Sequence, residues 1–143
     1  MRINEAVSRA HNTAVKHGWW DKEKIEPTQF GTLIALVHSE LSEALEESRN
    51  GRGVNETYYE CKITPKSIET YCECAKEGPC EAPEKDRAKC KNAKPCGIPS
   101  ELADAVIRIF DICGHYDIDL ERIIEEKMNY NETRPYKHGG KVF

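Results

Sequence analysis

The chain has 143 residues, of which 38% are apolar and 32% are charged, and its formal net charge at neutral pH is −4. This length is enough for one domain with a modest core. The acidic balance argues against nucleic-acid binding, which usually needs a basic excess, and no apolar run approaches the roughly 20 residues that span a bilayer. The N-terminal residues also lack the apolar region of a signal peptide. We therefore expect a cytoplasmic protein without a membrane or nucleic-acid partner.

Two helices are predicted in the first third of the chain. Apolar residues recur at helical spacing over residues 2–17, and Gly18 is placed to end that helix. A loop with two adjacent tryptophans follows. The second and longest helix is predicted over residues 28–49, because Thr28 is a suitable N-cap and an Asn-Gly pair follows the last helical residue.

Residues 51–98 interrupt the helical pattern. They hold four of the seven prolines and six of the seven cysteines, but few aliphatic residues. A loop this long is uncommon inside a compact domain. We interpret it as a cysteine-rich insertion within a single domain that covers residues 1–143. Its cysteines are Cys61, Cys72, Cys74, Cys80, Cys90 and Cys96.

These six cysteines lack the C-x-x-C pair that is typical of a zinc finger. Four of them could still complete a tetrahedral Zn²⁺ site. Disulfide bonds and free thiols are the alternatives, and a reducing compartment favours metal over disulfides. Zinc or disulfides would replace part of the apolar core that the insertion lacks.

Two further helices are predicted after the insertion. The third spans residues 100–115, where apolar residues cover a wide arc, so this helix should be deeply buried. The fourth begins near Asp119, a suitable N-cap, and ends before Pro135. Four helices without a convincing strand indicate an all-α fold that resembles a four-helix bundle, with the insertion between the second and third helices.

Two pairs of acidic residues are the strongest functional signal. Glu40 and Glu43 lie on the second predicted helix, and Glu101 and Asp104 lie on the third. A spacing of three residues places both acids of a pair on one helix face, about one turn apart. The simplest interpretation of one such pair is a solvated surface. Here both pairs border strongly apolar faces, and crowded carboxylates repel unless a cation such as Mg²⁺ neutralises them.

The segments that carry these acids resemble a known enzyme family. The chain resembles the MazG-like nucleotide pyrophosphohydrolases, a group of all-α NTP pyrophosphatases, in HSELSEALEE and in ELADAVIRIFDICGHYDIDLERIIEEKMNYNETRPYKHGGK. The family signature is an E-x-x-E motif on one helix and an E-x-x-D motif on the next, and the GWWD segment upstream adds to the likeness. The resemblance covers residues 1–50 and 98–143. The chain departs from the family in its insertion, which leaves 57 residues between Glu43 and Glu101.

The resemblance implies that a nucleoside triphosphate is hydrolysed between its α and β phosphates, which gives a monophosphate and pyrophosphate. Glu40, Glu43, Glu101 and Asp104 would hold Mg²⁺, with Mn²⁺ as an alternative ion. Glu43, or failing that Glu40, would take the proton from the attacking water. Clearance of non-standard or surplus nucleotides is the expected role. Because the family generally builds its sites in homodimers or homotetramers, we expect a homo-oligomer.

The resemblance also indicates residues that would bind the substrate. Four residues near the end of the chain match basic and amide positions of related enzymes and would bind phosphate: Lys127, Asn131, Arg134 and Lys137. The structural alternative for them is a basic helix end that complements the helix dipole. His11, Trp19 and Trp20 are candidates for binding the base, with packing of the rings in the core as the alternative.

Two other functions stay open at this point. The protein could be a regulatory module that binds a nucleotide without turnover. It could also be a metal-binding interaction protein, in which the insertion carries the function and the helices serve as its scaffold. Release of pyrophosphate from a nucleoside triphosphate would separate the enzyme from both alternatives.

Overall fold

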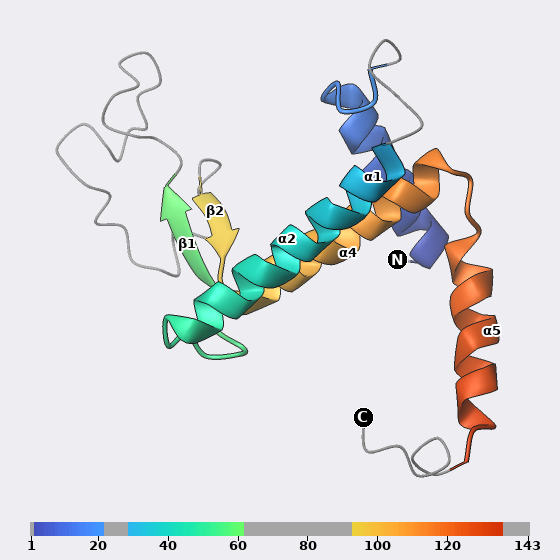
Figure 1. The fold of residues 1–143 in the computed structure, drawn as a ribbon. Coiled ribbons are helices and arrows are strands. Elements are labelled where there is room, and N and C mark those ends of the chain that lie inside the picture. The colour runs from blue at the N-terminus through green and yellow to red at the C-terminus, as the bar shows by residue number, and fades with distance from the viewer. Residues whose placement is uncertain (1, 22–28, 62–92, 136–143) are drawn as a thin grey trace, which may run out of the picture. The chain divides into compact units, whose positions relative to one another are not determined.

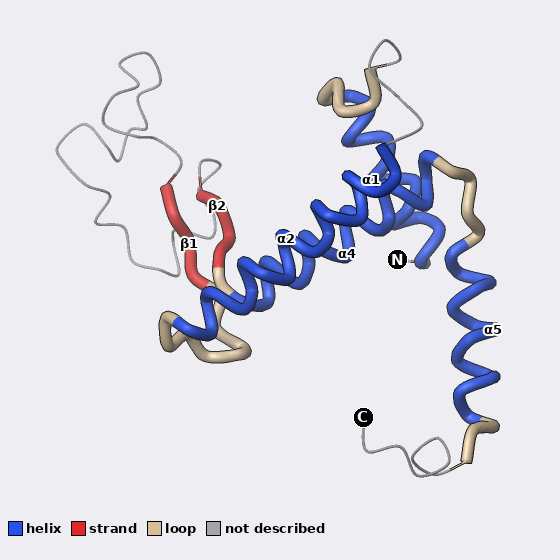
Figure 2. The backbone as a smooth tube through the Cα atoms, viewed as in Figure 1, coloured by secondary structure: helices blue, strands red, loops and turns tan. Residues whose placement is uncertain are grey.

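The computed structural model describes residues 2–21, 29–61 and 93–135, which contain four α-helices and a two-stranded antiparallel sheet (Figure 1). The elements in chain order are α1 (Ile3–Lys16), α2 (Gln29–Arg49), β1 (Tyr58–Cys61), β2 (Ala93–Cys96), α4 (Ile98–His115) and α5 (Leu120–Glu132). Figure 2 shows that helices make up most of the described backbone. This content agrees with the predicted all-α class, and each predicted helix is present.

The two strands correct the expectation of a chain without strands. β1 and β2 pair antiparallel, with Tyr58 opposite Cys96 and Cys61 opposite Ala93, so residues near the two ends of the predicted insertion meet. Each strand has four residues, which is too short for an alternating pattern to stand out in the sequence. The pairing also joins residues that are far apart along the chain, which no local pattern can report.

Contacts between residues divide the chain into two compact units. The first, here called the terminal unit, comprises Met1–Ile34 and Val106–Phe143. The second, here called the central unit, comprises Ala35–Ala105. α2 and α4 are each continuous helices that contribute residues to both units. Each unit has buried apolar residues of its own.

In the terminal unit, the first turn of α1 is hydrogen-bonded to the start of α5. Asp119 is the N-cap of α5, as predicted, since its side chain accepts a hydrogen bond from the amide of Arg122. The Asn4 side chain donates to Asp119 Oδ1 at 2.9 Å, and the Asn4 amide donates to Glu121 Oε2 at 3.1 Å. These two donors, Asn4 and Arg122, lower the pKa of Asp119. The cap therefore also joins the two helices.

Two glycines of the terminal unit have conformations or contacts that a larger residue would not tolerate. Gly18 ends α1 as predicted, with a φ of +78° that L-residues rarely adopt. Gly114 lies on α4, where a Cβ atom would come within 2.5 Å of His11 Cβ on α1. The two helices therefore approach closely at this point because the residue has no side chain.

The prediction that the helix of residues 100–115 is deeply buried is wrong for a single copy of the chain. Ala105, Ile112 and Cys113 are buried, but Leu102 is 46% exposed and other apolar residues of α4 are similarly open. Within the described residues, the apolar arc of α4 is therefore only partly covered. Among the described residues, no helix is both long and apolar enough to cross a membrane.

Candidate metal centre

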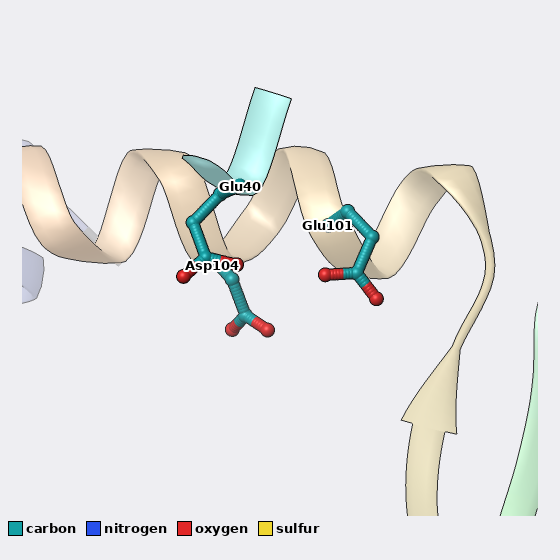
Figure 3. Close-up of side chains that lie close together, drawn as sticks. All are labelled: Glu40, Glu101 and Asp104. Atoms are coloured by element: carbon teal, nitrogen blue, oxygen red, sulfur yellow. The ribbon is translucent and has the colours of Figure 1, made fainter. Parts of the chain in front are cut away.

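Three of the four predicted acids come together in the central unit. Glu40 extends from α2, and Glu101 and Asp104 extend from α4 (Figure 3). One carboxylate oxygen from each residue lies within 4.8 Å of those of the other two. Glu40 is 6% exposed and Glu101 is 5% exposed, while Asp104 is partly exposed. We call these three residues the acid cluster.

The local sequence explains how the carboxylates come close. Ala44 follows Glu40 by four residues, and Ala105 follows Glu101 by four, so each alanine lies one turn along the same helix face. Both alanines are buried. Small side chains beside the acids leave room for carboxylates between the helices, where larger apolar residues would fill the space.

In the acid cluster, Glu101 has a buried carboxylate oxygen, Oε2, without a hydrogen-bond partner among the described residues. Burial is the main cause that raises the pKa of Glu101, and the charges of Glu43, Asp104 and Glu40 raise it further, against the opposing effect of Lys94. A buried carboxylate without a partner is costly. A bound cation would supply the missing partner.

Glu43 lies outside the acid cluster. Three residues advance the helix by about 300°, so the side chain of Glu43 projects about 60° around α2 from that of Glu40. Glu43 is exposed, whereas Glu40 is buried. Its charge still acts on Glu101, whose pKa it raises. The structure therefore places three of the predicted ligands together and leaves Glu43 at the edge of the site.

Lys94 acts on the site although no pattern in the sequence predicts it. It lies on β2, opposite Glu60, and its charge lowers the pKa of Glu101. No sequence signal identifies Lys94, because its position depends on the pairing of β1 with β2. An ammonium group near the carboxylates partly offsets their repulsion when no metal ion is bound.

The predicted phosphate-binding residues belong to the other unit. Lys127, Asn131 and Arg134 lie on or just after α5 in the terminal unit, and Lys137 lies outside the described residues. The Lys127 ammonium lies 5.3 Å from the centre of the Tyr130 ring, and the Arg134 guanidinium lies 5.9 Å from it. Contact of these residues with phosphate stays a prediction.

The predicted base-binding residues lie in an aromatic group of the terminal unit. The indole of Trp20 donates a hydrogen bond to Asp111 Oδ1 at 2.7 Å, and His11 Nδ1 lies 2.9 Å from the same oxygen. The Trp20 ring stacks on the His115 ring, with centroids 3.7 Å apart. Burial is the main cause that lowers the pKa of His115.

This packing distinguishes the two adjacent tryptophans. Trp20 is 8% exposed and is held by Asp111 and His115, so the structure favours a packing role for its ring. Trp19 is 61% exposed, and the Arg108 guanidinium lies 5.6 Å from the centre of its ring. Trp19 is therefore the ring with a surface free for a ligand.

The backbone of the sheet limits the pairing of the insertion cysteines. Cys61 and Cys96 are three positions apart along the ladder, which corresponds to about 10 Å, and a disulfide requires Cα atoms within about 7 Å. These two residues therefore do not bridge each other. Cys96 is a buried free thiol, and burial raises its pKa. Cys72, Cys74, Cys80 and Cys90 lie outside the described residues.

The raised pKa of Glu101 predicts how the stability of the metal-free protein depends on pH. Because this pKa lies above the ordinary value of 4.5, the folded chain keeps a proton that the unfolded chain has lost. The contribution of Glu101 to the free energy of unfolding should therefore fall as the pH rises from about 4.5 through the raised pKa.

Denaturant unfolding in a chelator between pH 4 and pH 8 tests this expectation on the wild type and on Glu101→Gln. The wild type should be the less stable of the two at neutral pH, and the difference should shrink as the solution is made acidic. Saturating Mg²⁺ should stabilise the wild type more than the variant. Parallel pH profiles for the two proteins would mean that Glu101 carries no such penalty.

Comparison with known proteins finds no matching family model, no matching curated protein and no matching solved structure.

Proposed function

We propose that this protein is a Mg²⁺-dependent nucleoside triphosphate pyrophosphohydrolase with a MazG-like fold, in which residues 51–98 are an insertion. The observation that carries the proposal is the buried Glu101 carboxylate, which has an unpartnered oxygen and faces Glu40 and Asp104. The second support is the resemblance of the two segments around these acids to that family. The substrate is split into a nucleoside monophosphate and pyrophosphate.

The donor set fits a hard divalent cation. All three ligand candidates are carboxylates, and Mg²⁺ prefers oxygen ligands at about 2.1 Å in octahedral geometry, where neighbouring ligand oxygens are about 3 Å apart. The oxygens of the acid cluster lie within 4.8 Å of one another. Small rotations of the side chains, or water molecules between ion and carboxylate, would complete the shell. Mn²⁺ accepts the same ligands and is the alternative ion.

The roles of the acids follow from their different environments. Glu40, Glu101 and Asp104 would hold the ion, which supplies charge neutralisation at the phosphates. Glu43 is exposed and is not one of the three residues of the acid cluster, although its charge acts on Glu101. Because it would not be a ligand of the ion, its carboxylate would take the proton from the attacking water. Glu40 is the second candidate for this base.

Substrate contacts extend the proposal to the terminal unit. Lys127, Asn131, Arg134 and Lys137 would bind the phosphates, and Trp19 would stack on the base, with His11 as a further candidate for contact with the base. Exposure supports Trp19 over Trp20 for this role. A stacking contact discriminates poorly between different bases. Such low specificity suits an enzyme that clears non-standard or surplus nucleotides.

A homodimer or homotetramer is part of the proposal. Leu41 and Leu45 on α2 and Leu102 on α4 are each more than 40% exposed within the central unit. Large apolar side chains that stay open in one chain gain from burial against a second copy. We also propose a cytoplasmic location, and that cysteines of the insertion bind Zn²⁺.

The test is to identify the products formed from a panel of ribo- and deoxynucleoside triphosphates with Mg²⁺, using phosphorus NMR. The proposal predicts equal amounts of monophosphate and pyrophosphate. A diphosphate with orthophosphate would mean that a different bond is cleaved. Tight binding of a nucleotide without any product would instead indicate the regulatory module that senses a nucleotide.

A further inference from the structure

A group of side chains ties the end of α2 to the sheet. The Tyr58 hydroxyl on β1 donates a hydrogen bond to Glu47 Oε1 on α2 at 3.0 Å. The Arg52 guanidinium lies 4.1 Å from the centre of the Tyr58 ring, and its Nε atom lies 3.9 Å from Glu47 Oε2. Arg52 also pairs with Glu56 at 2.7 Å. We call these four residues, Glu47, Arg52, Glu56 and Tyr58, the brace.

The sheet carries this connection to the start of α4. Tyr58 is opposite Cys96 in the ladder, and only Gly97 separates Cys96 from α4. The Gly97 carbonyl accepts hydrogen bonds from the amides of Ser100 and Glu101 at 2.9 and 3.2 Å. The turn of α4 that bears Glu101 is therefore built directly on the end of β2.

The brace and the acid cluster lie along the same helix face. Glu47 follows Glu40 by seven residues, which is about two turns of α2. The brace connects α2 to the sheet at Glu47. Glu40 lies about two turns before this point on α2, and Glu101 lies on the turn of α4 that follows β2. The sheet is therefore connected to both carboxylates.

We infer that the hydrogen bond from Tyr58 to Glu47 positions Glu101 beside Glu40 and thereby sets the affinity of the acid cluster for a divalent cation. The inference rests on the cation site of the proposed function. Glu47 and Tyr58 are positioning residues, since neither belongs to the acid cluster. Glu47 lies on α2 just before the insertion, and Tyr58 lies on β1 near its start, so the paired strands at the ends of the insertion would support the metal site.

The test compares variants that differ in this one hydrogen bond. Tyr58→Phe removes the donor, and Tyr59→Phe removes the same atom from the neighbouring tyrosine, which points to the other side of the strand. Glu47→Leu removes the acceptor, whereas Glu47→Gln keeps a carbonyl oxygen that accepts the bond. The affinity of each full-length protein for Mn²⁺ is measured by electron paramagnetic resonance, at a temperature where circular dichroism shows all of them folded.

Tyr58→Phe and Glu47→Leu should each bind Mn²⁺ about fivefold more weakly than the wild type, the size of effect expected from one ordinary hydrogen bond. Tyr59→Phe and Glu47→Gln should stay within about twofold of the wild type. Wild-type affinity in both Tyr58→Phe and Glu47→Leu would overturn the inference.

Three further outcomes separate this inference from the proposed enzyme. If the wild type binds Mn²⁺, the variants weaken as expected and no nucleotide is cleaved, the enzyme proposal fails and the inference stands. If nucleotides are cleaved but the variants bind Mn²⁺ normally, the inference alone fails. A wild type that binds no Mn²⁺ overturns both.

Discussion

Replacing Glu101 with glutamine is expected to lower kcat/KM for nucleoside triphosphate hydrolysis by at least about a hundredfold. A catalytic metal ion supplies several kcal/mol of transition-state stabilisation, and each 1.4 kcal/mol is a factor of ten in rate. Glutamine keeps the shape of the side chain but removes the charge that would hold the ion. Pyrophosphate release at a fixed, saturating Mg²⁺ concentration measures the loss.

Glu46→Gln is the matched control for this variant. Glu46 lies on α2, and its carboxylate pairs with Arg49 at 3.4 Å at the surface. It is not part of the acid cluster, and a surface ion pair contributes little to stability. Its loss should leave kcat/KM within about twofold of the wild type. Equal activity in Glu101→Gln and the wild type would remove Glu101 from the site.

Replacing Gly97 with alanine is expected to destabilise the protein by about 3 kcal/mol. Its φ is +100°, a conformation that costs an L-residue about 1–2 kcal/mol. A Cβ atom would also collide with the carbonyl oxygen of Glu56, and an overpacked site costs a further 1–3 kcal/mol. The free energy of unfolding from denaturant titration measures the effect.

The same substitution at Gly31 is the control. Gly31 lies on α2, and a Cβ atom there would meet no other atom within 4 Å. Gly31→Ala should therefore stabilise the protein by about 0.5–1 kcal/mol, the ordinary preference of a helix for alanine. If the two substitutions had the same effect, the backbone conformation and the close contact at Gly97 would not require glycine.

Local chemistry made several features predictable from the sequence. Asp119 caps α5, because a cap depends on a side chain and the amides that follow it within one turn. The pairing of Glu40 with Glu101 and Asp104 was also predictable, because helical spacing places the acids on helix faces that border apolar residues. The same spacing could not show that Glu43 lies to one side, since a difference of 60° around a helix matters only once the partner helix is in place.

Features that depend on distant residues were not predictable. The bond between Glu47 and Tyr58 needs β1 to pair with β2, and those strands lie on either side of the long central part of the insertion. The position of Lys94 near Glu101 has the same origin. The apolar arc of residues 100–115 predicts more burial than α4 shows, because the pattern gives the surface that a helix could bury, whereas the neighbouring elements decide how much of it is buried.

The most direct measurement of the central claim is the Mg²⁺ dependence of pyrophosphate release by the wild-type protein. The protein is first freed of metal with a chelator, and the initial rate is then followed as Mg²⁺ is added at a constant excess of nucleoside triphosphate. We predict no release without the ion, a rate that saturates with Mg²⁺, and a saturation point that moves to higher Mg²⁺ in Glu40→Gln. Release of pyrophosphate at an unchanged rate in the presence of the chelator would contradict the claim that the acid cluster is a metal centre.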